Sequence, residues 1–275
     1  MTLRAALDEA IRQLDQGQAG APRLTAEVLL AHALGQERSY LYAHDLEPCP
    51  DEVFSAFRDL VRERLAGRPT QYLTGRQEFY GRDFRVTPAV LIPRPETEHV
   101  VERALALAGD GQRLADVGCG SGAIGVTLAL ELRRRMVLTD LSAEALWMAR
   151  ENAAALGARC DFVQGDALSM LGTKSLDLIV SNPPYIPLTD APILACEVRD
   201  AEPALALFGG ESGNDVYARI MEEAPRVLRS GGWLVMELGW QSAAAVCAMA
   251  AAHFTQVEVG QDLAGHDRVF SARLK

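Results

Sequence analysis

Apolar side chains in the first 75 residues recur at the spacing of amphipathic helices. Two such faces are formed by Leu3, Leu7, Ala10, Ile11 and Leu14, and by Val53, Phe57, Leu60, Val61 and Leu65. A third apolar segment spans residues 26–34 and ends at Gly35, which is suited to a helix C-cap. We expect these faces to bury one another in a small helical bundle. Because the bundle contains no catalytic motif, it could be a packing module or a substrate-docking domain.

Beyond the bundle, the pattern changes twice. Residues 76–90 show alternation around a glycine turn, which predicts a short β-hairpin linker. After residue 113 there are short apolar runs, at residues 114–117, 136–139, 160–163, 176–181 and 233–238, with helical stretches at residues 143–156 and 216–228. This alternation is typical of a parallel sheet covered by helices. The sequence therefore predicts an α/β fold with a mostly parallel sheet over residues 91–275, after a helical domain over residues 1–75.

The charge and cysteine content narrow the range of partners. With 37 acidic and 27 basic side chains, the chain has a formal charge of −10 and no basic stripe for duplex DNA. The five cysteines form no C-x-x-C pair and have no histidine at metal-ligand spacing, so we expect neither disulfides nor a metal site. No apolar run approaches the about 20 residues of a membrane span, and no leader sequence is evident. A cytoplasmic protein that binds neither membranes nor DNA is expected.

A glycine-rich loop, DVGCGSGAIG at residues 116–125, follows the first strand of the α/β region. Glycines here allow a tight turn and a close approach to a ligand beside a helix N-terminus. The loop contains G-x-G-x-x-G, and Asp140 lies 20 residues after Gly120, as in dinucleotide sites. By itself it leaves a nicotinamide-dependent enzyme and an S-adenosylmethionine-dependent methyltransferase both open. Asp116 favours the methyltransferase, because a carboxylate suits a ligand with ammonium and sulfonium groups.

The second motif is the tetrad Asn182, Pro183, Pro184 and Tyr185, which ends the run at residues 176–181. In an open parallel sheet, this places the tetrad at the same edge as the glycine loop. The Asn182 side-chain oxygen and the Pro183 carbonyl could accept the two N–H groups of an amide or amine, and Tyr185 offers a flat face. The alternative is a rigid turn with no chemical role. The position of the tetrad after the glycine loop favours a methyltransferase acting on a planar nitrogen.

In several segments the chain closely resembles the bacterial release factor glutamine methyltransferases, the PrmC or HemK family. The matching segments are residues 76–79, 91–98, 116–122, 179–186, 202–210, 231–234 and 262–269. Asn-Pro-Pro-Tyr alone is shared with adenine-N6 DNA methyltransferases, but LIPRPETE at residues 91–98 and EPALALFGG at residues 202–210 are much more specific. In the N-terminal third, only residues 69–75, the length and the helical character match.

This resemblance implies a Rossmann-like class I methyltransferase domain that takes S-adenosylmethionine. It implies methylation of the glutamine N5 in the Gly-Gly-Gln motif of class I peptide chain release factors, with the helical domain as the docking module. The implied cofactor site comprises Asp116, Gly118, Cys119, Gly120, Ser121, Gly122, Asp140, Asp166, Ala167 and Asn182. The implied substrate site comprises Asn182, Pro183, Pro184 and Tyr185, of which Asn182, Pro183 and Tyr185 would be catalytic. Ala167 is a departure, because family members often carry an aromatic residue there.

Two other functions remain possible at this point, adenine-N6 methylation of nucleic acid and nicotinamide-dependent dehydrogenation. The acidic charge counts against the first, and the second is supported only by the G-x-G-x-x-G pattern. Glu96 and Glu98 are typical of the acids in a first helical turn, and a contact of Arg94 or Glu96 with substrate or cofactor is the alternative. Asp177 begins a strand, and solvent is its expected partner.

Overall fold

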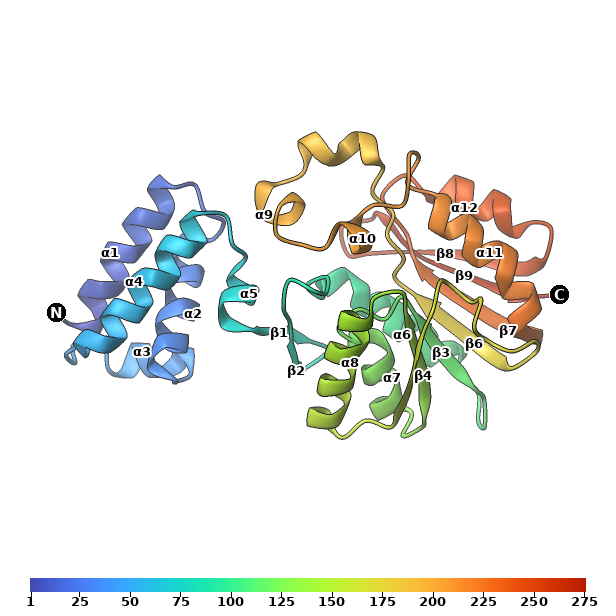
Figure 1. The fold of residues 1–275 in the computed structure, drawn as a ribbon, viewed down its shortest axis with the longest axis horizontal. Coiled ribbons are helices and arrows are strands. Elements are labelled where there is room, and N and C mark those ends of the chain that lie inside the picture. The colour runs from blue at the N-terminus through green and yellow to red at the C-terminus, as the bar shows by residue number, and fades with distance from the viewer. The chain divides into compact units, whose positions relative to one another are not determined.

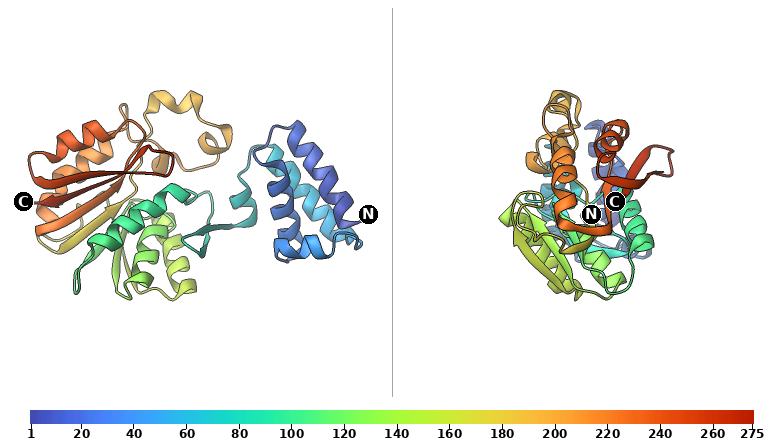
Figure 2. Two further views of the ribbon diagram at one scale, coloured as in Figure 1. Left: turned by 180° about the vertical axis from the view of Figure 1, so that it is seen from behind. Right: turned by 90° about the vertical axis from the view of Figure 1, so that its right-hand side faces the viewer.

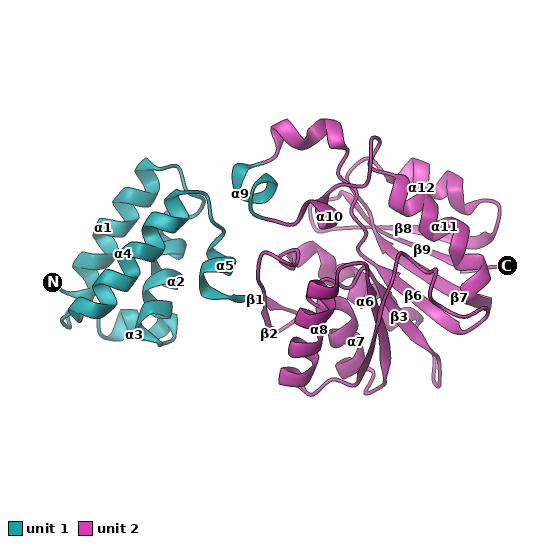
Figure 3. Ribbon diagram, in the orientation of Figure 1, with its two compact units in different colours: residues 1–76, 195–201 teal, residues 77–194, 202–275 magenta.

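The computed structural model describes all residues from Met1 to Lys275. The chain divides into two compact units (Figure 3), one of residues 1–76 and 195–201 and the other of residues 77–194 and 202–275. No helix in either unit combines the length and apolar character needed to cross a membrane.

The first unit is helical, and its elements are labelled in Figure 1. They are α1 (Leu3–Gln16), α2 (Pro22–Leu34), α3 (Arg38–Ala43), α4 (Asp51–Leu65), α5 (Thr70–Thr74) and α9 (Cys196–Arg199). The Thr2 hydroxyl caps α1 by accepting from the Ala5 N–H, and Gly35 ends α2 with a φ of 65°. The apolar faces of α1, α2 and α4 form one core, as the helical periodicity predicted.

One position in this bundle differs from the sequence prediction. The sequence pattern predicted that Leu65 lies on the buried face of α4. In the structure Leu65 is 42% exposed, and the neighbouring Arg64 is buried instead. The Arg64 guanidinium pairs with Glu197 of α9. A charged group can replace an apolar one here because the ion pair and the aliphatic stem of arginine both contribute to the packing.

The second unit is built on a seven-stranded sheet with the order β5-β4-β3-β6-β7-β9-β8. The strands are β3 (Leu114–Val117), β4 (Met136–Asp140), β5 (Cys160–Gln164), β6 (Leu176–Ser181), β7 (Leu228–Glu237), β8 (Phe254–Gln261) and β9 (Asp267–Leu274). β3 to β7 pair in parallel, whereas β9 runs antiparallel to both β7 and β8. The predicted mostly parallel sheet is confirmed.

Helices cover both faces of this sheet. α6 (Glu98–Leu107), α7 (Ala123–Glu131) and α8 (Ala143–Leu156) share one core, and α11 (Asp215–Val227) and α12 (Ala243–Ala250) share the other. In Figure 2, the first three are green and the last two orange, on opposite sides of the strands. Successive residues of β6 point to alternate cores, Leu178 and Val180 to one and Ile179 to the other. Shorter elements of this unit are η1 (Pro95–Thr97), η2 (Leu188–Ile193) and α10 (Ala204–Leu207).

The predicted hairpin is formed by β1 (Arg76–Phe79) and β2 (Arg82–Arg85). Its two turn residues, Tyr80 and Gly81, both have positive φ, 52° and 71°, as a two-residue hairpin turn requires. The Tyr80 N–H donates to Glu98 Oε1 over 2.8 Å. Phe79 and Phe84 are buried in the core shared with α6, α7 and α8, so the hairpin packs as part of the second unit.

Asn152, buried on α8, connects this hairpin to the glycine loop. Its Oδ1 accepts from the Arg85 N–H over 2.8 Å, and its Nδ2 donates to the Arg85 carbonyl over 3.0 Å and to the Ser121 carbonyl over 2.8 Å. One side chain thus satisfies three backbone groups of two segments that are distant in sequence.

We expect Asn152→Ala to lower the free energy of unfolding by about 2–4 kcal/mol, because it leaves three backbone groups without partners, and the Ser121 carbonyl among them is buried. Urea unfolding would measure the loss. Glu151→Ala is the matched control, since Glu151 precedes Asn152 on the same helix and forms only a solvent-exposed ion pair with Arg85. Its effect should stay within about 0.5 kcal/mol. Equal effects of the two substitutions would contradict a connecting role for Asn152.

Candidate functional site

The register of the parallel strands brings the two sequence motifs to one edge of the sheet. Val117, the last residue of β3, is paired with Thr139 of β4 on one side and with Ser181 of β6 on the other. Ser181 is in turn paired with Met236 of β7. The residues that follow these rungs therefore leave the sheet together, as expected for the ligand-binding edge of an α/β sheet.

The glycine loop is held by β4. The N–H groups of Gly118 and Cys119 both donate to the Thr139 carbonyl over 2.9 Å, and the Gly120 N–H donates to Asp140 Oδ2 over 2.9 Å. Gly120 has a φ of 53°, and a Cβ there would meet no protein atom within 4 Å. Glycine at this position therefore provides both the left-handed turn and open space for a ligand.

Gly122 is constrained differently. Its φ is 83°, and an added Cβ would lie 3.2 Å from the Ala149 Cβ of α8. The loop thus approaches α8 closely at Gly122 and stays open at Gly120. Both Cys119 and Ser121 are buried, and burial raises the pKa of the Cys119 thiol well above its usual range.

Asp116, on β3, is buried beneath the loop. Its Oδ2 accepts from the Gly125 N–H over 2.8 Å, and its Oδ1 is buried without a hydrogen-bond partner. Burial raises the pKa of Asp116 to about 7, against the opposing effect of the Gly125 hydrogen bond. A carboxylate with one unused oxygen in so apolar a place is an acceptor for a cationic group.

Asp140 ends β4 and is also mostly buried. Its Oδ1 accepts from the Ser142 N–H over 2.9 Å, while Oδ2 accepts from Gly120. Burial raises the pKa of Asp140, and these backbone donors oppose the rise. The loop after β5 reaches the same place, because the Gly165 N–H donates to the Asp140 carbonyl over 3.0 Å. Asp166 in that loop pairs with Arg219, and Ala167 has a positive φ of 48°.

The tetrad begins one residue after β6. Asn182 Nδ2 donates to Thr97 Oγ1 over 3.2 Å, whereas no protein group donates to Asn182 Oδ1 or to the Pro183 carbonyl. Pro183 is buried. The following backbone is fixed by the stretch from residue 202 to 213: the Ile186 N–H donates to the Leu207 carbonyl over 2.9 Å. This pairing brings together residues 179–186 and 202–210, two of the segments that carry the family resemblance.

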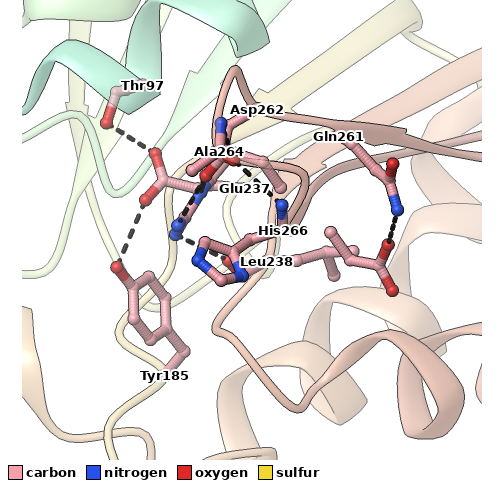
Figure 4. A network of polar contacts seen from close by, with 10 residues as sticks. Thr97, Tyr185, Glu237, Leu238, Gln261, Asp262, Ala264 and His266 are labelled. Atoms are coloured by element: carbon pink, nitrogen blue, oxygen red, sulfur yellow. Dashed lines mark hydrogen bonds and ion pairs between the residues drawn. The ribbon is translucent and has the colours of Figure 1, made fainter.

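A buried carboxylate, Glu237, lies beside the tetrad at the end of β7 (Figure 4). Its Oε2 accepts from Thr97 over 2.5 Å and its Oε1 accepts from the Tyr185 hydroxyl over 3.3 Å. Burial raises the pKa of Glu237, and the Thr97 hydrogen bond and the Arg268 charge oppose it. Glu237 was not among the residues predicted from the sequence. The available signal was one acid in the otherwise apolar run at residues 233–238.

Comparison with known proteins agrees with this geometry. The model of the PrmC N-terminal domain matches residues 5–75, and that of the methyltransferase small domain matches residues 98–198. A release factor glutamine methyltransferase from Koribacter versatilis is 42% identical, with 99% of each chain covered. Another, from Moorella thermoacetica, is 46% identical over 99% of this chain and 98% of its own. The chain belongs to the release factor glutamine methyltransferase family.

The fold comparison is consistent with this family. A methyltransferase of known structure from Pyrococcus furiosus has a TM-score of 0.55 and 19% identity, and the match covers 71% of this chain and 90% of the other. The match to the methyltransferase small domain and the membership of the family confirm the expected cofactor, S-adenosylmethionine. The residues at the sheet edge fit it: Asp116 has an unused buried acceptor, and Gly120 leaves space at the loop.

The family motif at residues 91–98 has a structural explanation. Arg94 pairs with the buried carboxylate of Glu202, which also accepts from the Ile92 N–H over 3.2 Å. Glu98 holds the hairpin turn through Tyr80. The expectation for Asp177 was wrong: its carboxylate accepts from the Arg113 N–H over 2.8 Å and pairs with Arg229 over 3.2 Å. Both partners lie at the starts of β3 and β7, the two strands that flank β6.

We expect Asp116→Asn to change how stability without cofactor depends on pH. The raised pKa means that the folded protein binds a proton that the unfolded aspartic acid, with a pKa near 3.9, releases. Between about pH 4 and pH 7 the wild-type protein should therefore lose stability as pH rises, and the asparagine variant should lose less. From pH 5 to pH 8 the melting temperature of the variant relative to wild type should rise by about 3 °C or more.

Thermal unfolding at the two pH values measures this difference. Asp110→Asn, on the surface of the same unit, controls for the loss of one negative charge. Calorimetry at pH 8 should show weaker S-adenosylmethionine binding by Asp116→Asn. A melting-temperature difference that stays constant with pH would show that the buried Asp116 does not titrate in this range.

Proposed function

We propose that this protein transfers a methyl group from S-adenosylmethionine to the N5 atom of the glutamine in the Gly-Gly-Gln motif of class I peptide chain release factors. Relatives named release factor glutamine methyltransferase match it over nearly their whole length. The observation that carries the proposal is the pair of unused acceptors, Asn182 Oδ1 and the Pro183 carbonyl, on consecutive residues after β6. A primary amide has two N–H donors and needs two such acceptors.

The proposed catalytic residues act on the amide nitrogen. Asn182 and Pro183 hold its two N–H groups, which turns the nitrogen toward the cofactor and shares the positive charge that develops on it. Tyr185 offers its ring to the flat amide, while its hydroxyl is held by Glu237. When bound, S-adenosylmethionine supplies an electrophilic methyl group on a sulfonium leaving group. Positioning by these residues can lower the barrier by up to roughly 7–11 kcal/mol.

We assign the cofactor to the loop between β3 and α7. The backbone from Gly118 to Gly122 would lie against it, with Asp116 facing its ammonium group and Asp140 its ribose hydroxyls. Asp166, Ala167 and Asn182 complete the proposed set at the ends of β5 and β6. Because Ala167 has no ring, stacking on the adenine is not part of this assignment.

The other two functions are less well supported. Family membership removes the nicotinamide-dependent dehydrogenase. Adenine-N6 methylation shares the tetrad, but a chain with a net charge of −10 is poorly suited to a nucleic-acid backbone. With a release factor as its substrate, we propose that the enzyme acts in the cytoplasm and contacts neither membranes nor DNA.

We assign substrate docking to the helical domain of residues 1–75. Every residue proposed for chemistry lies beyond Gln77. A folded protein substrate requires a larger contact area than a single loop provides. The match of residues 5–75 to the PrmC N-terminal domain supports a role specific to this family.

We expect Asn182→Ala to slow single-turnover methylation of release factor by about 10²–10³-fold, because it removes a charge-stabilising contact made in the transition state. Asn182→Asp should retain more activity, since a carboxylate still accepts a hydrogen bond. Mass spectrometry of the Gly-Gly-Gln peptide would measure both rates. A near wild-type rate for Asn182→Ala would reduce the tetrad to a rigid turn and refute the proposed function.

For the helical domain, we expect a protein that begins at Gln77 to bind S-adenosylmethionine and to methylate a short Gly-Gly-Gln peptide as the full chain does. On intact release factor its kcat/KM should fall by at least about tenfold, because the docking surface is missing. Comparing the two substrates separates recognition from chemistry. Full activity of the shortened protein on intact release factor would show that the domain is not needed for docking.

A further inference from the structure

The role proposed for Asn182 depends on which way its side-chain amide faces. The two ends of this group have nearly the same shape, but one is a carbonyl acceptor and the other an NH2 donor. Only the carbonyl can accept an N–H from a substrate amide. Turned over, Asn182 would present a donor to a donor, and the contact would become repulsive.

Thr97 determines the orientation, because a hydroxyl has only one proton to donate. Thr97 Oγ1 lies 2.5 Å from Glu237 Oε2 and 3.2 Å from Asn182 Nδ2. Glu237 Oε1 already accepts from the Tyr185 hydroxyl, and an ionised carboxylate only accepts, so with Glu237 ionised the proton of Thr97 goes to Glu237 Oε2. The lone pairs of Thr97 then face Asn182, and they can be satisfied only by its NH2 group. Thr97 and Glu237 are both buried, which leaves little room for water to relax this requirement.

Glu237 is itself held on several sides. Its Oε1 accepts from the Tyr185 hydroxyl, and its backbone carbonyl accepts from the Tyr217 hydroxyl over 2.8 Å. The Arg268 guanidinium, which donates to the neighbouring Leu238 carbonyl and pairs with Asp262, provides a positive charge nearby. Figure 4 shows Glu237 between Thr97 and Tyr185, with the turn from Asp262 to His266 beside it.

We propose that Thr97 and Glu237 are positioning residues that fix the amide of Asn182 with its carbonyl toward the substrate. This inference rests on the proposed function, since a substrate NH2 group is what requires an acceptor there. It adds two residues that act through Asn182 without touching substrate or cofactor. It also explains why a carboxylate is buried at Glu237, since burying a charged group costs free energy and does not by itself stabilise the fold.

The decisive pair of variants is Thr97→Ser and Thr97→Val. Serine keeps the hydroxyl, and we expect its single-turnover rate to stay within about twofold of wild type. Valine keeps the shape but not the hydroxyl, and the rate should fall about tenfold, as for the loss of one orienting hydrogen bond. The Kd for S-adenosylmethionine and the KM for release factor should change by less than about threefold in both. Equal rates for serine and valine would overturn the inference.

Thr127→Val is the matched control for the loss of a buried threonine hydroxyl. Thr127 lies on α7, is buried, and its Oγ1 has no partner. Its rate should equal that of wild type. Thermal unfolding of all variants identifies any loss that arises from folding. Glu237→Gln provides a second measurement, because glutamine can donate to Thr97 and reverse the chain of hydrogen bonds, so this variant should also be slowed.

A double-mutant comparison tests the mechanism. In Asn182→Asp both side-chain atoms are acceptors, so there is no amide orientation left to fix. Adding Thr97→Val to that variant should therefore change its rate by less than about twofold. A loss of about tenfold in both backgrounds would mean that Thr97 acts through packing. If Asn182→Ala is slow and Thr97→Val is as fast as wild type, only this inference fails; if Asn182→Ala is fast, the proposed function fails.

Discussion

The pairing of β3 with β6 brings the glycine loop and the tetrad, the two motifs of the candidate site, to the same edge of the sheet. Val117 and Ser181 form the last rung of this pair, and the Ser181 hydroxyl donates to the Val117 carbonyl over 2.7 Å. One strand then continues into the glycine loop and the other into the tetrad. A shift of one residue would turn every core side chain of β6 to the opposite face and move Asn182 away from the loop. The proposed neighbourhood of cofactor and substrate is thus a consequence of strand register.

Three acids accumulate at this edge, and each has its pKa raised by burial: Asp116, Asp140 and Glu237. Buried carboxylates oppose folding when they are charged, so these three acids lower the free energy of unfolding of the protein without cofactor. A cationic cofactor that binds only the folded state recovers part of it through linkage. The large cores on both faces of the sheet supply the stability that tolerates this arrangement.

The elements around the site could be predicted because their signals are local. The runs at residues 114–117 and 176–181 became β3 and β6 with the same bounds, and residues 143–156 became α8. The C-terminal β8 and β9 were not predicted, and β8 is an edge strand whose residues are mostly exposed, so no apolar alternation marks it. The hydrogen-bond partners within the site could not be predicted from the sequence either. Thr97 and Glu237 are separated by 140 residues, and only the folded chain shows that they meet.

Two glycines outside the tetrad limit how this site can diverge. A Cβ on Gly209 would lie 2.5 Å from the Pro184 carbonyl oxygen, and one on Gly213 would lie 2.4 Å from that of Tyr185. The backbone of the tetrad therefore packs directly against a segment some 25 to 30 residues downstream, which constrains its conformation. Substrate preference cannot be transplanted between homologues by exchanging the tetrad loop alone. Residues 182–187 and 207–213 pack as one structural unit, so a chimera between homologues has to exchange both segments together.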